Sequence, residues 1–550
     1  GKRAEIAEMF IGKTYVLFIY TYLKDVRLVY APPRSIGNYG GETDNWIWPR
    51  HTGDFSFMRI YVAPDGSPAE YAPENVPFQP KRVISVAPEG VNDEDFVFIL
   101  GYPGRTYRHR TSHYLAYEYE VRLPAVVKLY DWEITVLESI GENDRAIAIK
   151  LASHIKSLSN TMKNYRGKLQ GIRRIGLLEQ KRQEELALQT FINADPERQS
   201  KYGTILKEIE VLYDEIRQRA DYEFALKYLK RSSVLLNTAY TVYDMSLELE
   251  KDDLERESEY QDRNLDRTRE RMFLRLKNFH AAADHVRLQN MFEFCATLPP
   301  DYHIPPVNKI AGSNKPAKRI NRYITKSLAK SRLDDPNYVR SLMELSAGEI
   351  AAIKDPFIQL AVALYPVYQQ QKEIADTRSG KIDQLHGLLI DIKKEFRASD
   401  FVPDANGTLR LTYGHIRGYS PADATFQYPI TTLKGVIEKN IGKPPFDLPE
   451  KIITLYQNQD FGRYEHPELH SVPVGILYNM DTTGGNSGSA VLNSHGQLVG
   501  INFDRVFEAT INDFAWNEAY SRSIAVDIRY VLWILEKYSG ATNLLNEIGL

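Results

Sequence analysis

Two long stretches without proline occupy the middle of this 550-residue chain. No proline occurs between Pro124 and Pro196, or between Pro196 and Pro299, and both stretches are rich in Leu, Glu, Lys, Arg and Ala. Proline breaks helices and these residue types favour them, so long helices are expected there. Apolar residues recur at spacings of three or four with charges between them, as at Leu206, Ile209, Leu212 and Ile216. This pattern predicts amphipathic helices.

The regions on either side have the character of β-structure. Short β-branched and aromatic runs, punctuated by Gly and Pro, predict strands at 15–22, 26–30, 55–62 and 96–100. The pattern returns near residue 401, with strands at 472–480 and 490–503, a hairpin signal at 493–496 and an apolar helix at 526–538. The length also implies more than one domain. We therefore expect three parts: β-rich 1–105, an inserted helical domain at 106–400, and β-rich 401–550 with a C-terminal helix.

The composition excludes several functions. The net charge of −3 does not favour nucleic acid or an anionic membrane as a partner. No apolar run approaches the roughly 20 residues of a membrane-spanning helix. The single cysteine, Cys295, excludes an internal disulfide and a cysteine-based zinc cluster. It is expected to be a buried thiol near a helix end, and not a nucleophile.

The segment Thr483-Gly-Gly-Asn-Ser-Gly-Ser-Ala490 lies between two predicted strands. A serine nucleophile needs a tight turn whose backbone N–H groups face the oxyanion, and glycine permits both the turn and the close approach of substrate. Ser487 fits this role, with the amides of Gly485 and Ser487 as oxyanion donors. The context is not the strand-to-helix Gly-x-Ser-x-Gly elbow of α/β-hydrolases. An ordinary Gly/Ser-rich turn is the alternative interpretation.

Several further motifs point to one family. They are Gly41–Phe55 (GETDNWIWPRHTGDF), Gly101-Tyr-Pro-Gly104, Ser159–Asn164 (SNTMKN), and Asn502-Phe-Asp-Arg505 after the GGNSGS loop. With these motifs, essentially the whole chain resembles the bacterial serine dipeptidyl peptidases of the dipeptidyl-peptidase 7 and 11 group, most closely dipeptidyl-peptidase 11. The resemblance implies a chymotrypsin-like double β-barrel, with the first barrel incomplete here and a large α-helical domain inserted between the barrel halves.

The resemblance also assigns catalytic roles. It makes Ser487 the nucleophile and Asp54 the carboxylate that orients a catalytic histidine. Asp54 follows Thr-Gly and opens a predicted strand, where a carboxylate can point into a cleft between barrels. Without the family, an Asp that closes a turn is the simpler interpretation.

An enzyme that removes dipeptides must bind the substrate's α-ammonium at a fixed distance from the serine. Acidic and amide oxygens are suitable partners for this three-donor group. The family pattern gives this role to Asn45, Trp46, Asn160 and Asp504. Taken alone, each Asn is a typical cap or turn residue.

Arg505 carries the predicted specificity. The resemblance implies that arginine at this position selects Asp or Glu before the cut, whereas glycine accompanies apolar preferences. A planar guanidinium can hold a carboxylate through two parallel hydrogen bonds, and burying it unpaired penalises apolar substrates. The alternative is a strand arginine paired with Asp504 or Glu508.

The base required by this chemistry is not evident. His51 lies three residues before Asp54, but it matches a non-catalytic family position. The family's catalytic histidine lies in an upstream Thr-Asn-His-His-Cys-Gly-Tyr-like segment that these 550 residues do not contain. We therefore expect a chain that lacks its amino-terminal portion and is a poor catalyst as given. Ala490 stands where a proline often follows the loop.

The leading hypothesis is a serine dipeptidyl aminopeptidase that releases amino-terminal dipeptides with Asp or Glu at the second (P1) position. Its partners would be oligopeptides with a free N-terminus, without nucleic acid, a membrane span, a metal or a cofactor. The resemblance implies a periplasmic or cell-surface location in a Gram-negative bacterium, and a homodimer. Two alternatives remain: a catalytically inactive protein that binds acidic amino-terminal peptides, and a helical scaffold.

Overall fold

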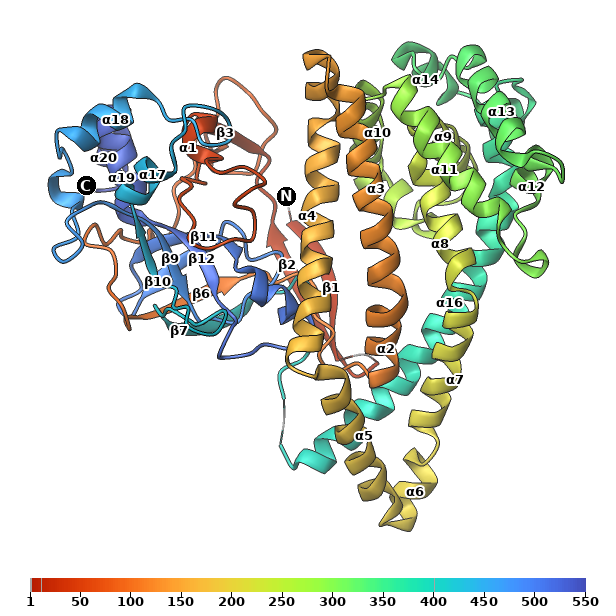
Figure 1. Cartoon of the computed structure of the whole chain (residues 1–550), viewed down its shortest axis with the longest axis horizontal. Coiled ribbons are helices and arrows are strands. Elements are labelled where there is room, and N and C mark those ends of the chain that lie inside the picture. Colours follow the sequence, from red (N-terminus) through yellow and green to blue (C-terminus); the bar gives the residue numbers. More distant parts are fainter. Residues whose placement is uncertain (1, 11, 400) are drawn as a thin grey trace. The chain divides into compact units, whose positions relative to one another are not determined.

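The computed structural model describes residues 2–10, 12–399 and 401–550 and has two compact units (Figure 1). The first unit consists of Gly1–Leu115, Asn160–Gly203 and His386–Leu550, and the second of Ala116–Ser159 and Thr204–Leu385. Helices α4 (Arg145–Arg174) and α16 (Pro356–Arg397) continue from one unit into the other. The C-terminal half of α4 thus belongs to the β-rich unit, and the three-part division drawn from the sequence stays a prediction.

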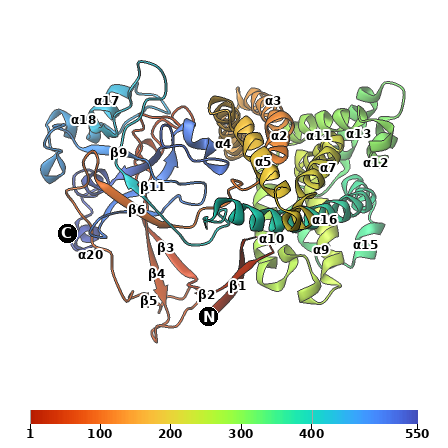
Figure 2. The ribbon, with the colours of Figure 1, turned by 90° about the horizontal axis from the view of Figure 1, so that it is seen from below.

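The described part of the first unit contains three antiparallel sheets. The seven-stranded sheet has the order β7 (Arg410–His415), β6 (Phe96–Gly101), β10 (Ala490–Asn493), β11 (Leu498–Arg505), β12 (Ser523–Asp527), β9 (Pro473–Tyr478), β8 (Ile430–Thr432). The second sheet is β3 (Asp25–Tyr30), β4 (Phe57–Val62) and β5 (Val76–Pro77), which lie side by side in Figure 2. The third is the hairpin of β1 (Lys2–Phe10) and β2 (Thr14–Thr21).

Short helical segments complete the first unit. They are α1 (Arg34–Gly37), α2 (Ser112–Tyr117, whose last residues enter the second unit), α5 (Leu177–Asn193), α6 (Pro196–Tyr202), α17 (Leu433–Lys439), α18 (Glu450–Gln457), η6 (Gly462–Tyr464), η7 (Phe507–Asp513), α19 (Ile528–Trp533), η8 (Ile534–Tyr538) and α20 (Thr542–Glu547). The predicted apolar helix therefore begins at Ile528, not at Val526. Val526 pairs with Ile501 in the sheet, and the Asp527 side chain accepts a hydrogen bond from Arg529 N and caps α19.

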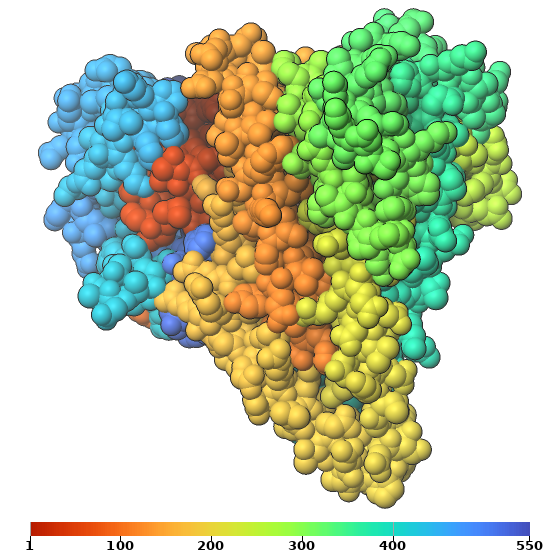
Figure 3. Space-filling view, turned by 45° about the vertical axis from the view of Figure 1, so that its right-hand side comes forward, coloured from red at the N-terminus to blue at the C-terminus, as the bar shows by residue number. Residues whose placement is uncertain are grey.

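The second unit is helical, and its residues 204–385 run from yellow through green to blue-green in Figure 3. Besides parts of α4 and α16 it contains η1 (Glu118–Arg122), α3 (Leu123–Gly141), α7 (Ile205–Gln218), α8 (Ala220–Leu229), η2 (Lys230–Ser232), α9 (Val234–Leu249), η3 (Asp253–Glu255), η4 (Ser258–Tyr260), α10 (Asp262–Lys277), α11 (Ala281–Ala296), η5 (Pro300–Tyr302), α12 (Pro305–Ala311), α13 (Pro316–Lys330), α14 (Pro336–Leu342) and α15 (Ala347–Ala352). Across the described residues, no helix is long and apolar enough to cross a membrane.

The prolines that bound the helical stretches lie at helix starts. Pro124 is in the first turn of α3, Pro196 opens α6 and Pro299 is the N-cap residue of η5. A proline is tolerated there because the first N–H groups of a helix have no intrahelical partner. Pro366 is the exception and lies inside α16. The helical prediction for the middle of the chain is confirmed.

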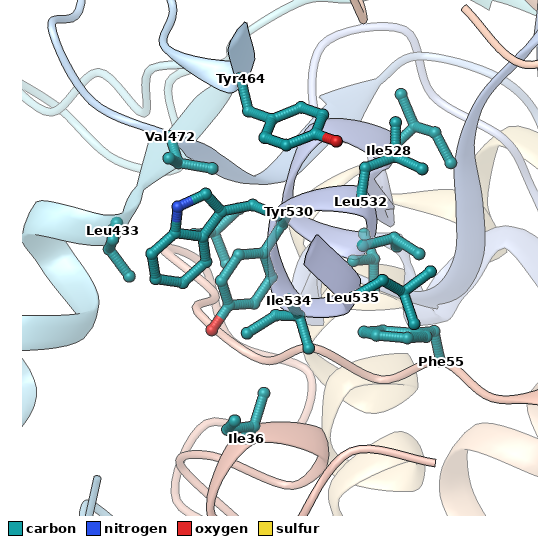
Figure 4. Close-up of a cluster of buried hydrophobic side chains, with 14 of the residues drawn as sticks. Ile36, Phe55, Leu433, Tyr464, Val472, Ile528, Tyr530, Leu532, Ile534 and Leu535 are labelled. Atoms are coloured by element: carbon teal, nitrogen blue, oxygen red, sulfur yellow. The ribbon is translucent and has the colours of Figure 1, made fainter. Parts of the chain in front are cut away.

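A buried apolar cluster fixes the segment that leads into β4. Phe55 packs with Ile36, Tyr530 and further aliphatic side chains from α17 and α19 (Figure 4). A side chain at Gly53 would approach Ile36 and Tyr530 to 3.0 and 3.1 Å, so the backbone itself lies against the core. Residues 53–55 are therefore held rigidly, with Asp54 exposed between them. The mixed β and helical content agrees with the sequence, while the closed double barrel stays a prediction.

Candidate active site

Ser487 lies on the loop between β9 and β10, where two glycines have left-handed backbone conformations. Gly485 has φ 105° and Gly488 has φ 85°. A side chain at Gly485 would approach Tyr102 O to 2.4 Å and Gly104 N to 2.7 Å. Gly104 N in turn donates a hydrogen bond to Gly484 O (2.6 Å). The loop is thus fitted against the Gly101–Gly104 turn, and only glycine fits at 485.

Two asparagines hold the loop in shape. The buried Asn486 side chain accepts a hydrogen bond from Thr483 N (3.0 Å). On β11, Asn502 donates through Nδ2 to Asn486 O (3.0 Å) and accepts from Gly488 N through its backbone oxygen (2.7 Å). The Tyr478 hydroxyl donates to Asn502 Oδ1 (2.5 Å). These contacts determine the position of Ser487 relative to β11.

The loop leaves two backbone donors available. Within the described chain, neither Gly485 N–H nor Ser487 N–H donates a hydrogen bond. The Ser487 hydroxyl donates to Phe503 O (3.1 Å), one residue before Asp504. A loop with a partly exposed hydroxyl and unused amides can accept a carbonyl oxygen that becomes negatively charged.

Four of the predicted substrate-binding residues lie together. The Asn160 side-chain oxygen accepts from Asn45 Nδ2 (3.1 Å) and from Trp46 Nε1 (2.9 Å). Trp46 N donates to Asp504 Oδ2 (3.3 Å), and the residue adopts a positive φ of 64°. The strained backbone at Trp46 aims its amide at Asp504. The cluster joins the 41–55 segment, α4 and β11.

Asp504 is a buried carboxylate with a cationic partner. Arg50 NH1 contacts Asp504 Oδ2 at 2.8 Å, and Arg505 N donates to Asp504 Oδ1 (2.8 Å). Burial raises the pKa of Asp504, and the Arg50 guanidinium opposes that rise. The carboxylate is therefore paired with one arginine. Sequence reasoning missed Arg50, although it lies in the quoted 41–55 motif.

Arg505 is 4% exposed, and its guanidinium does not pair with the Asp504 or Glu508 side chain that the sequence suggested as alternatives. NH1 donates to Thr482 O (3.2 Å) and NH2 to Asp513 Oδ1 (3.1 Å). In the described residues, Nε has no acceptor. The guanidinium carbon lies 5.4 Å from the centre of the Trp46 ring, within cation–π range.

Asp513 and Lys168 were not singled out from the sequence. Asp513 accepts from Thr483 Oγ1 (2.5 Å) and pairs with Lys168 Nζ on α4 (2.6 Å). The only sequence signal for this pairing is the spacing of Gly167 and Gly171, which puts two residues without side chains on one face of the helix. Their contact with η7 depends on tertiary packing and cannot be deduced from the local pattern.

The His51 side chain is in the interior. It is 5% exposed and packs on α17, where a side chain at Gly435 would approach its Nε2 to 2.1 Å. Burial, reinforced by Lys439, lowers the pKa of His51 to about 3. Asp54 is exposed, and the Ser487 hydroxyl donates to Phe503 O.

A serine between glycines, free amides beside it and a nearby cluster of acidic and amide groups are features of a peptidase site. The chain belongs to the peptidase S46 family, whose model matches residues 1–550. It is 34% identical to an Asp/Glu-specific dipeptidyl-peptidase of Shewanella putrefaciens, over 100% of this chain and 77% of that protein. It is 31% identical to dipeptidyl-peptidase 7 of Capnocytophaga gingivalis, over 99% of this chain and 75% of that protein.

Solved structures agree with this family. The crystal structure of Porphyromonas endodontalis DPP11 with the dipeptide Arg-Glu has a TM-score of 0.83 and 29% identity. The match covers 100% of this chain and 78% of that one. Another structure of the same protein, in complex with substrate, has a TM-score of 0.81 and 28% identity. The family resemblance seen in the sequence is thereby confirmed.

Proposed function

We propose that this protein is a serine-type dipeptidyl peptidase that releases amino-terminal dipeptides with Asp or Glu at the second position. The observation that carries this proposal is Arg505, a buried guanidinium whose Nε–H has no acceptor in the described chain. Its NH1 contacts Thr482, next to the serine loop. A substrate carboxylate is the group that best satisfies such a donor. The names of the relatives support the same specificity.

Ser487 is the proposed nucleophile. Its oxygen would attack the scissile carbonyl, and the base would take its proton and return it to the departing amine. Water would then hydrolyse the acyl-enzyme. The unused amides of Gly485 and Ser487 are placed to receive the negatively charged oxygen. Asp54 is proposed to orient the base.

Asn45, Trp46, Asn160 and Asp504 form the proposed ammonium site. The Asn160 side-chain oxygen and the Asp504 carboxylate are the acceptors gathered here, and an ammonium would bind by exchanging with or adding to the hydrogen bonds that they accept from Asn45 and Trp46. Binding the free α-ammonium there would set the length of the released fragment at two residues. Oligopeptides with a free N-terminus are accordingly the proposed substrates.

We also propose that none of the twelve histidines of this chain is the base for Ser487. His51 is buried against Gly435 with its pKa lowered to about 3, and the Ser487 hydroxyl donates to a backbone oxygen. Hydrolysis by residues 1–550 alone should be slow, as in peptidases that lack one triad member. The double barrel, the periplasmic or cell-surface location and the homodimer remain proposals based on the family.

The function is tested first by binding, which does not need the base. Isothermal titration calorimetry should show that the dipeptide Arg-Glu binds at least tenfold more tightly than Arg-Gln, because only the former has a side-chain carboxylate. Acetylation of the dipeptide's N-terminus should abolish binding. Equal affinities for Arg-Glu and Arg-Gln would refute the proposed specificity.

Hydrolysis separates the enzyme from an inactive peptide-binding protein. Fluorogenic dipeptides ending in Asp or Glu should be cut, however slowly, and Ser487→Ala should abolish this activity while keeping Arg-Glu affinity within about twofold. The matched control is Ser489→Ala in the same loop. Cleavage that persists in Ser487→Ala would rule out Ser487 as the nucleophile.

A further inference from the structure

Three buried charged side chains from different elements meet beside the serine loop. Lys168 of α4, Asp513 at the end of η7 and Arg505 at the end of β11 form what we call the Lys168–Asp513–Arg505 cluster. Asp513 joins the other two, with Oδ2 at 2.6 Å from Lys168 Nζ and Oδ1 at 3.1 Å from Arg505 NH2. The three side chains are 9%, 13% and 5% exposed, in the order Lys168, Asp513, Arg505. Ion pairs this deeply buried are weakly screened by solvent.

The charges of the cluster do not balance. Burial favours the neutral form of Asp513, but Arg505 and Lys168 outweigh it and hold its pKa below the usual range, so the carboxylate is ionised. Two cations therefore share one anion. Two neighbouring arginines have carboxylate partners of their own: Arg108 pairs with Asp481 (2.7 Å) and Arg50 with Asp504 (2.8 Å). Among these three side chains, one positive charge is in excess.

The backbone of α4 is fitted closely against η7. A side chain at Gly167 would approach Thr510 Oγ1 to 2.2 Å, and one at Gly171 would approach Ile511 Cβ to 2.8 Å. These glycines, four residues apart, lie on one face of the helix. They let the helix backbone approach η7 closely enough to hold Lys168 at Asp513. The ammonium is therefore a fixed part of the cluster.

We propose that Lys168 is a positioning residue for the selection of acidic substrates. It acts through Asp513: by sharing this carboxylate, it prevents Asp513 from neutralising Arg505. The cluster then accepts one further negative charge, the side-chain carboxylate of the substrate's second residue. The Thr483 hydroxyl of the serine loop also donates to Asp513, so one carboxylate contacts both the loop and the two cations of the cluster. This inference rests on the proposed role of Arg505.

The test compares Arg-Glu and Arg-Gln binding by calorimetry in Lys168→Met and Lys168→Gln. Met removes the charge and keeps the length, and Gln keeps an amide donor to Asp513 should Met prevent folding. In both variants the preference for Arg-Glu should fall about tenfold, while Arg-Gln affinity stays within about twofold. Lys156→Met, which removes an exposed lysine of the same helix, should leave both affinities unchanged.

An equal loss of affinity for Arg-Glu and Arg-Gln would show that Lys168 has a merely structural role. An unchanged preference for Arg-Glu over Arg-Gln would also overturn the inference. The variant Arg505→Met distinguishes an error in the proposed role of Lys168 from an error in the proposed function. If Arg505→Met abolishes the preference and Lys168→Met retains it, only the role of Lys168 is wrong. If the unmodified protein has no preference, the proposed specificity itself is wrong.

Discussion

At the scale of single residues, His51 shows how burial changes the acid–base behaviour of a side chain. Its pKa is lowered to about 3, from 6.5, so the folded protein binds this proton less readily than the unfolded chain does. Its contribution to stability is therefore fully present above pH 6.5 and is lost as the pH falls towards 3. The loss should reach about 1.4 kcal/mol of unfolding free energy per pH unit.

The measurement is thermal unfolding of the unmodified protein and of His51→Gln between pH 7.5 and 5. Gln has no proton to gain, so the melting temperature of the variant should decrease less steeply below pH 6.5. His495→Gln, on the exposed hairpin turn, is the control and should leave the slope unchanged. Identical pH slopes for His51→Gln and the unmodified protein would contradict the burial argument.

Arg505→Gly tests the proposed selectivity at one side chain. Removing the guanidinium leaves Asp513 paired with Lys168 and opens space beside Trp46. We expect the preference for Glu-ending over Leu-ending dipeptides to fall at least tenfold in calorimetric titrations, because the substrate carboxylate loses its partner and the penalty on apolar side chains disappears. An unchanged ratio would show that selectivity lies elsewhere.

The sequence indicated most residues of the candidate site, but not all of their partners. It pointed to Asn45, Trp46, Asn160, Asp504 and Arg505, which the structure brings into contact or near contact. It could not indicate Asp513 and Lys168. A carboxylate at the end of a short helical segment and a lysine on a long helix are ordinary surface residues until packing places them together. Their pairing depends on two elements that are more than 300 residues apart in the chain.

At the scale of elements, the contact between α4 and η7 should tolerate no added methyl group. In Gly171→Ala the new Cβ would lie 2.8 Å from Ile511 Cβ, which is fixed to its backbone and cannot rotate away. Overpacking of about 1–3 kcal/mol should exceed the gain of about 1 kcal/mol in helix propensity. The melting temperature should fall.

Gly380→Ala is the matched control for this prediction. Gly380 lies inside α16, is exposed, and a Cβ there would have no neighbour within 4 Å. Only the helix propensity changes, so this variant should gain up to about 1 kcal/mol in stability. A Gly171→Ala protein as stable as Gly380→Ala would mean that the two elements separate easily.

Element types were predictable where the periodicity was strong. The apolar spacing at 206–216 corresponds to α7, and the proline-free stretches are helical. Boundaries were less predictable at 526–538, where one apolar run contains the end of β12 and the whole of α19. Local hydrophobicity is the same on both sides of Asp527. The pairing of Val526 with Ile501 and the cap at Asp527 separate strand from helix, and a single-sequence pattern does not contain the pairing.

At the scale of the whole molecule, the β1–β2 hairpin exposes an apolar face. Ile6 and Leu17 are directly paired across the strands, and Ile19 lies two residues further along β2 on the same side. They are 73%, 59% and 63% exposed. An apolar strand pair of this kind favours association. We expect the chain to associate in a concentration-dependent way in sedimentation velocity experiments.

The variant Leu17→Lys with Ile19→Lys should reduce that association without lowering the melting temperature, because both side chains are already in water. Thr14→Lys with Thr21→Lys adds the same charge to β2 but removes no apolar surface. If this control reduces association equally, net charge and not the apolar face would be the cause.

Trp46 makes three separate contacts from one residue: its amide with Asp504, its indole N–H with Asn160 and its ring face with Arg505. The amino terminus and the second side chain of a bound dipeptide would thus be recognised by groups that all contact Trp46. In this chain a substitution at Trp46 would disturb all three contacts at once, whereas a substitution at Arg505 would leave the contacts of Trp46 with Asp504 and Asn160 in place. A new substrate preference should therefore arise by substitution of Arg505 on β11, with Trp46 retained.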